Sequence, residues 1–245
     1  MFRRRKSEQP DAESGAVDAV DADEDLELDD EADVEPVGSR ATGPFDEDEA
    51  PDDGVARLDL GALRVPGVEG MELRLDVDEN GEQVIAVTVV HEESAVQLMA
   101  FAAPRTEGIW SEVRGEIKGN LASTGPVDEV DTEFGRELLA TITVVGPQGT
   151  PVVQPVRFVG VDGPRWFVRG LFSGAAARDR AAAAPLEAVL RATVVVRGTD
   201  PMAPGDALTL RVPTVVPEGM QRNEEPEGRP TLPAPKRGPE ITEIR

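Results

Sequence analysis

The residue types that carry most enzyme and metal chemistry are scarce in this chain. It contains no Cys, no Tyr and a single His, which excludes thiol nucleophiles, zinc fingers, iron–sulfur ligation, disulfides and histidine-rich metal sites. That His91 stands beside Glu92 and Glu93, where a carboxylate could support it as a general acid or base. No Cys, and no Ser in a strand-to-helix elbow, accompanies it as a nucleophile. We therefore interpret His91 as an exposed turn histidine and expect no catalytic residue.

Three carboxylates alternate along one predicted strand and form the chain's best candidate for a metal site. Glu129, Asp131 and Glu133 would project from one face about 7 Å apart, whereas Ca²⁺ and Mg²⁺ need oxygens that converge at about 2.0–2.6 Å. A solvated or charge-protected strand face is the favoured interpretation. Because no phosphate-binding glycine motif follows a strand either, we expect no metal and no cofactor.

Two segments are better suited to binding than to catalysis. The predicted hairpin around Asp162, Arg165 and Trp166 combines a carboxylate, a guanidinium and a large aromatic ring, the composition of interface hot spots. Its alternative is a turn whose Trp166 packs under the second helix. Near the C-terminus, Ile241 and Ile244 could add as a strand to a partner's sheet edge, with a frayed terminus as the alternative. These five residues are the candidate interaction residues.

The charge distribution separates the chain into three parts. Of 48 acidic and 25 basic residues, residues 1–57 hold 20 and 6, a net charge of -14, whereas residues 58–217 carry -8. We predict a disordered acidic N-terminal region over 1–57, a single domain over 58–217 and a disordered Pro-rich tail over 218–245. Nucleic acid is not an expected partner, because phosphate contacts need clustered Lys and Arg.

No segment of the sequence is expected to span or target a membrane. The basic cluster Arg3 to Lys6 lacks a following apolar run of the kind found in signal peptides. No stretch of 18 or more apolar residues occurs. We therefore expect a cytoplasmic protein.

The middle part reads as an alternation of strands and two helices. Asn80-Gly81 and Asp162-Gly163 indicate hairpins, the second with a loop running to Arg165 because Pro164 lacks an N–H. One amphipathic helix is predicted over 107–121, and a second beginning near Pro185 with an ambiguous end at 193–196. Strands are predicted at 58–60, 72–77, 84–90, 95–102, 127–133, 137–145, 152–161, 166–172 and 207–212. The prediction is an α+β fold, a mainly antiparallel sheet with two packed helices.

Several segments resemble an uncharacterised actinobacterial family, the domain of unknown function (DUF) 3710. The resembling segments are Val65–Arg74, Phe101–Trp110, Arg157–Gly170, Val196–Gly198, Met202–Pro204 and Arg237–Arg245. The family implies no biochemical activity. The order of elements alone also resembles the fold of Mog1 and PsbP, which would concern fold and not function.

The sequence favours one function class over another. Because no nucleophile, base and orienting group can be assembled, we expect a non-enzymatic protein-interaction module with an acidic arm and a protein partner. The alternative is a small-ligand receptor or cryptic enzyme that uses carboxylate and Arg groups in a pocket between sheet and helix.

Overall fold

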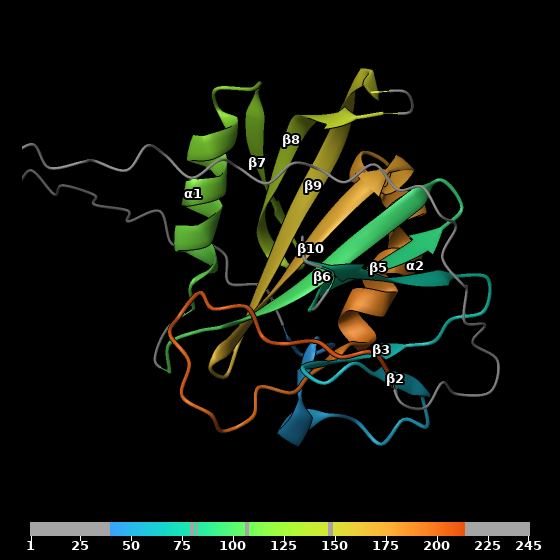
Figure 1. The fold of residues 1–245 in the computed structure, drawn as a ribbon, viewed down its shortest axis with the longest axis vertical. Coiled ribbons are helices and arrows are strands. Elements are labelled where there is room, and N and C mark those ends of the chain that lie inside the picture. Colours follow the sequence, from blue (N-terminus) through green and yellow to red (C-terminus); the bar gives the residue numbers. More distant parts are fainter. Residues whose placement is uncertain (1–39, 79–80, 82, 106–107, 147–148, 214–245) are drawn as a thin grey trace, which may run out of the picture. The chain divides into compact units, whose positions relative to one another are not determined.

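The computed structural model describes residues 40–78, 81, 83–105, 108–146 and 149–213. The remaining residues, which include most of the predicted acidic region, all of the predicted Pro-rich tail, Ile241 and Ile244, lie outside the described residues. The described residues form two sheets and two α-helices, α1 and α2 (Figure 1). The predicted α+β fold is confirmed. None of the described helices is long and apolar enough to cross a membrane.

The larger sheet has seven strands in the order β4-β5-β6-β10-β9-β8-β7, and every neighbouring pair is antiparallel. Its strands are β4 (Glu72–Val77), β5 (Val84–His91), β6 (Ser94–Ala102), β7 (Val127–Thr132), β8 (Gly135–Val145), β9 (Pro151–Gly163) and β10 (Trp166–Gly174). Each of these strands was predicted to within three residues at either end. Alternation between buried and exposed positions is a local signal, so it survives into the folded sheet.

The smaller sheet has the order β1-β11-β3-β2 and gathers short strands from distant parts of the chain. These are β1 (Phe45–Asp46), β2 (Arg57–Asp59), β3 (Leu63–Pro66) and β11 (Val194–Val195), with a short 3-10 helix η1 (Glu47–Glu49) after β1. β1 pairs with β11 in parallel. Regular structure therefore begins inside the predicted acidic region, before Leu58, because the backbone of β1 finds a partner 149 residues later, at Val194.

Helix α1 (Trp110–Leu121) lies where the sequence predicted it and packs on one face of the large sheet. Trp110 is buried, and Val113, Ile117 and Leu121 follow it along the helix at spacings of three or four residues, packing against the same cluster. That cluster includes Leu138 and Phe158 from the sheet, together with further residues of β6, β8, β9 and β10. The apolar stripe predicted from the sequence is the packed face.

Helix α2 (Arg180–Ala192) begins five residues before the predicted start at Pro185. Asp179 caps it by accepting a hydrogen bond from the Ala181 N–H at 2.8 Å, and a run of alanines, the best helix formers, follows. These two effects place Pro185 inside the helix, where proline removes one backbone hydrogen bond. The helix ends at Ala192 and β11 follows, which resolves the ambiguity over 193–196.

The core lies on the opposite face of the large sheet from α1. Leu186 and Leu190 of α2 and Leu63 of β3 join a buried cluster with Trp166 and Phe172 of β10. The final predicted strand, 207–212, is instead three isolated bridges, in which Ala207 pairs with Phe101 and Leu210 with Gly61 and Val84. A small 3-10 helix, η3 (Ala175–Ala177), connects β10 to α2.

Candidate functional site

The hairpin singled out by the sequence is a structural element of the core. Its loop consists of Pro164 and Arg165, since Trp166 already pairs with Gly163, so the loop runs to Arg165 as the sequence predicted. Trp166 is fully buried and donates a hydrogen bond from Nε1 to Asp46 Oδ2 at 2.7 Å. Its ring therefore packs in the buried cluster that also contains Leu186 and Leu190 of α2, in line with the core position that the sequence offered as the alternative.

Asp162 caps α1 from a strand that follows the helix by some 50 residues. Its Oδ1 accepts hydrogen bonds from the backbone N–H groups of Ile109 at 2.9 Å and Trp110 at 3.2 Å. Burial raises the pKa of the Asp162 carboxyl, although the two backbone hydrogen bonds act in the opposite direction. These two hydrogen bonds give Asp162 a structural role as a cap of the α1 N-terminus.

Arg165 turns the hairpin in the left-handed region, with φ of 62°. Its guanidinium donates to the Gly198 carbonyl at 2.9 Å, and its own carbonyl accepts from the Ala103 N–H at 2.9 Å and from Arg197 Nε at 3.2 Å. The candidate residues Asp162, Arg165 and Trp166 thus face different parts of the protein and do not converge.

The carboxylates of the β7 region form separate ion pairs. Glu129 pairs with Arg114 at 2.9 Å and also with Lys118, and Asp131 pairs with Arg136 at 2.9 Å. Among the described residues, no three or more His, Asp or Glu side chains are grouped to hold a metal ion.

Two further predicted positions have different surroundings. Glu133 lies beyond the end of β7 and pairs with Arg191 of α2 at 2.8 Å. His91 ends β5 opposite Ser94 and is half-buried, because the turn itself falls on Glu92 and Glu93. The sequence had placed His91 in the exposed turn.

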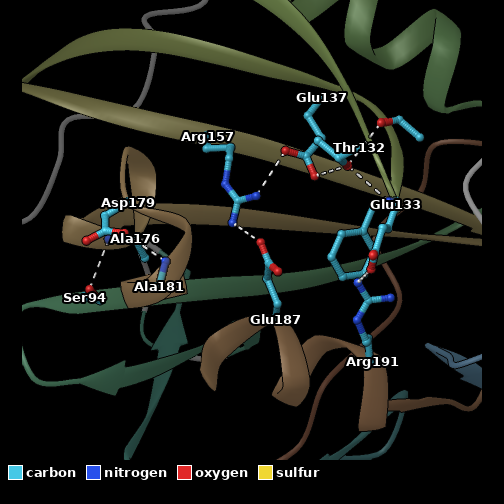
Figure 2. A network of polar contacts seen from close by, with 12 residues as sticks. Ser94, Thr132, Glu133, Glu137, Arg157, Ala176, Asp179, Ala181, Glu187 and Arg191 are labelled. Atoms are coloured by element: carbon cyan, nitrogen blue, oxygen red, sulfur yellow. Dashed lines mark hydrogen bonds and ion pairs between the residues drawn. The ribbon is translucent and has the colours of Figure 1, made fainter. Parts of the chain in front are cut away.

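A buried ion-pair network joins the sheet to α2 (Figure 2). Arg157 of β9 donates to Glu137 Oε2 at 3.1 Å and to Glu187 Oε1 at 2.7 Å. Thr132 Oγ1 donates to the other oxygen of Glu137 at 2.7 Å. Glu137 is fully buried, and burial raises the pKa of its carboxyl although Arg157 and Thr132 lower it.

A cavity of about 90 Å³ adjoins this network. It is lined by Val130, Thr132, Glu137, Leu139, Arg157 and the stretch Ala176–Arg180. A cavity of this size has room for a few waters, whereas small-molecule sites usually measure about 300–1,000 Å³. Both terminal nitrogens of Arg157 already bind carboxylates of the protein. The cavity suits solvent or a very small polar species.

Three of the exposed valines among the described residues lie on the part of the β8–β9 hairpin that extends beyond its neighbours. Among the described residues, β7 pairs with β8 only as far as Ala140, and β10 pairs with β9 only from Val156 onward. Residues 141–145 and 151–155 therefore pair only with each other, and we call them the ribbon. The hairpin can be followed past the end of β10 in Figure 1.

The ribbon has an unusual composition for this acidic chain. The 19 residues from 138 to 156 contain no charged residue, and no other stretch of the sequence is as long without one. Val145, Val152 and Val153 are 40%, 42% and 66% exposed. This charge-free run is visible in the sequence, but its exposure follows from the lengths of the neighbouring strands.

Comparison with known proteins identifies a matching family but no biochemical activity. No curated protein and no solved structure matches the chain, so the resemblance to Mog1 and PsbP is not confirmed. A family model described as a protein of unknown function matches residues 43–218. The match begins just before β1 and so spans every described strand and helix.

Proposed function

The chain belongs to the DUF3710 family, and within it we propose that this protein is a non-enzymatic protein-interaction module that contacts its partner through the ribbon. The observation that carries the proposal is the exposure of Val145, Val152 and Val153 on an uncharged strand pair with open edges. Exposed strand edges offer unpaired backbone N–H and C=O groups to a partner strand. Exposed apolar side chains add contact area on binding.

The charge of the remaining chain supports a role in steering. Residues 1–57 carry a net charge of -14 and residues 58–217 a net charge of -8. Such a field accelerates encounters with basic partners and opposes binding to nucleic acid. We propose a cytoplasmic protein in which the acidic residues before β1 act as an arm, the folded part from β1 onward as the binding domain and residues 218–245 as the tail.

The alternative, a small-ligand receptor or cryptic enzyme, would use the cavity beside Glu137 and Arg157. Its volume of about 90 Å³ is below that of ordinary ligand sites, so it stays the second candidate. A small ligand that raises the melting temperature of the wild-type protein, but not of a Glu137→Gln variant, would favour this alternative.

Site-specific photo-crosslinking in cells tests the proposed interaction surface. A photoreactive residue at position 153 should give crosslinked protein adducts, whereas one at position 212 should not. Val212 is the matched control because it is 62% exposed, close to the 66% of Val153. Equal adduct yields at the two positions, or none at position 153, would contradict the proposal.

A further inference from the structure

The edges of the large sheet differ in charge. The outer strands β4 and β7 carry Glu72, Arg74 and Asp76, and Asp128, Glu129 and Asp131, respectively. Charges of this kind protect a sheet edge from pairing with another strand. The part of β8 beyond Ala140 has no described strand partner on its β7 side and carries no charged residue, although Gly125 lies near the Thr141 carbonyl. It is the unprotected edge of this sheet among the described strands.

From this difference we infer that the ribbon binds the ribbon of a second copy of this chain. The two β8 edges would pair antiparallel around a two-fold axis. The inference rests on the proposed interaction role and names its partner. The arrangement would extend the antiparallel sheet from one copy into the next.

The sequence of the edge suits pairing with itself. Residues 141–145 read Thr-Ile-Thr-Val-Val, five consecutive β-branched residues, the type most enriched in strands. In an antiparallel pair of identical edges, β-branched side chains would face β-branched side chains, a favourable cross-strand combination. An isologous contact requires only this one self-complementary patch.

Electrostatics points to the same contact. Each copy carries a formal net charge of -23, so two copies repel wherever acidic surfaces approach. Pairing through β7 would bring Asp128 against its equivalent and crowd the ion-paired Glu129 and Asp131, and like charges opposite one another destabilise a strand pair. Pairing through the β8 edge would instead bring the copies together through residues 141–145, which lie inside the 19-residue run without a charge. Salt should strengthen the contact, because it screens the repulsion between the remaining charges.

The other edge of the ribbon limits the assembly to two copies. The outer edge of β9 has no described partner before Val156 and contains Pro151 and Pro155. Proline has no backbone N–H to donate to a strand ladder. Once the β8 edges have paired, the assembly therefore presents only the proline-bearing edges, and a dimer is expected rather than a fibre.

Sedimentation velocity of the full-length protein, from about 5 to about 500 µM, tests the inference at about 0.05 M and about 0.5 M salt. The short contact is smaller than a standard interface of about 1,600 Å², so dimers should appear toward the higher concentrations and more readily in high salt. Thr143→Lys places like charges together in the paired edges and should weaken dimerisation at least tenfold, as an order of magnitude. Val212→Lys makes the same charge change elsewhere and should not weaken it.

Thr143→Lys lowers the net negative charge, so a general charge effect would strengthen association, opposite to the expected result. Val145→Lys, on the same β8 edge and exposed, provides a second ribbon variant if Thr143→Lys fails to fold by circular dichroism. A monomer at every concentration, a dimer insensitive to both ribbon variants, or growth beyond two copies would overturn the inference. So would a dimer that disappears on removal of residues 240–245, because the tail would then be the occupant. A monomer whose position 153 still crosslinks to other proteins would leave the proposed function standing.

Discussion

The indole N–H of Trp166 donates a hydrogen bond to a carboxylate oxygen of Asp46, with 2.7 Å between nitrogen and oxygen. Trp166 is fully buried in β10, and Asp46 lies 120 residues earlier, in β1. The acid-rich part of the chain therefore supplies the polar partner of the largest buried side chain. Asp46, one of the many carboxylates of this acid-rich part, is therefore a structural residue.

Replacing Asp46 with Ala should lower the free energy of unfolding by about 1–3 kcal/mol, because the buried indole N–H loses its acceptor. Urea unfolding followed by tryptophan fluorescence measures the loss. Asp48→Ala is the matched control, since Asp48 is exposed and lies two residues away. Equal stability of the two variants would show that the hydrogen bond contributes nothing.

A truncation that removes residues 1–57 should lower the melting temperature by at least about 4 °C. It removes Asp46 and also Arg57, whose Nε donates to the Ala192 carbonyl at 2.7 Å. A shorter truncation that removes residues 1–39 keeps both contacts and should leave the melting temperature unchanged. Scanning calorimetry of the two proteins distinguishes these results, and identical melting temperatures would contradict the prediction.

The sequence predicted the parts of the fold that local patterns encode. Alternation along β4 and the spacing of Val113, Ile117 and Leu121 in α1 each reflect one element packed against one face. The short strands β1, β3 and β11 have two to four residues, too few for a clear period, and escaped prediction, whereas β2 was found from its Leu-Asp-Leu alternation. β1 and β11 pair with partners far away in the chain, whereas β3 pairs both with distant β11 and with nearby β2.

The candidate site was harder to predict than the fold. Asp162 and Trp166 looked suited to binding because their residue types are common in interfaces, yet tertiary contacts make one a helix cap and the other a core residue. The ribbon left a signal in the sequence, a long charge-free run. Its exposure depends on β7 and β10 ending before it does, which no local pattern reports.

Asp162→Ala should destabilise the protein by about 1 kcal/mol, and by about 2 kcal/mol at most, since two N–H groups at the start of α1 lose their acceptor. Asp162→Asn keeps an acceptor oxygen and should retain most of the stability. Thermal unfolding by circular dichroism compares the two variants. Equal losses would mean that the negative charge, and not the capping hydrogen bond, stabilises the helix.

Gly160→Ala should destabilise the protein by about 1–3 kcal/mol through overpacking. A Cβ at this position would lie 2.1 Å from the ring of Trp110, which is itself stacked on Phe167 with ring centroids 5.5 Å apart. Gly115→Ala is a control of opposite sign. No atom lies within 4 Å of its added Cβ, and replacing a helical glycine should stabilise by about 0.5–1 kcal/mol. Urea unfolding measures both changes, and a stable Gly160→Ala variant would contradict this packing.

The stability of the wild-type protein relative to Glu137→Gln should fall as the pH rises above 4.5, the ordinary pKa of a glutamate. Burial raises the pKa of Glu137 in the folded protein, so between 4.5 and that raised value the folded state holds a proton that the unfolded state has released. The contribution of Glu137 to the free energy of unfolding is therefore fully present below pH 4.5. It is lost as the pH rises through the folded-state pKa of Glu137. Each unit by which the folded-state pKa exceeds the unfolded-state pKa corresponds to about 1.4 kcal/mol of unfolding free energy.

Urea unfolding of both proteins at steps from about pH 4 to about pH 8 measures this difference. Leu139→Ala is the control, because Leu139 lines the same cavity but does not titrate, so its effect on the unfolding free energy should not change with pH. The stability difference should shift in favour of the Gln variant above pH 4.5 and become constant once the pH exceeds the folded-state pKa of Glu137. A wild type that instead gains stability over this range would mean that the attraction of Arg157 outweighs the burial of Glu137.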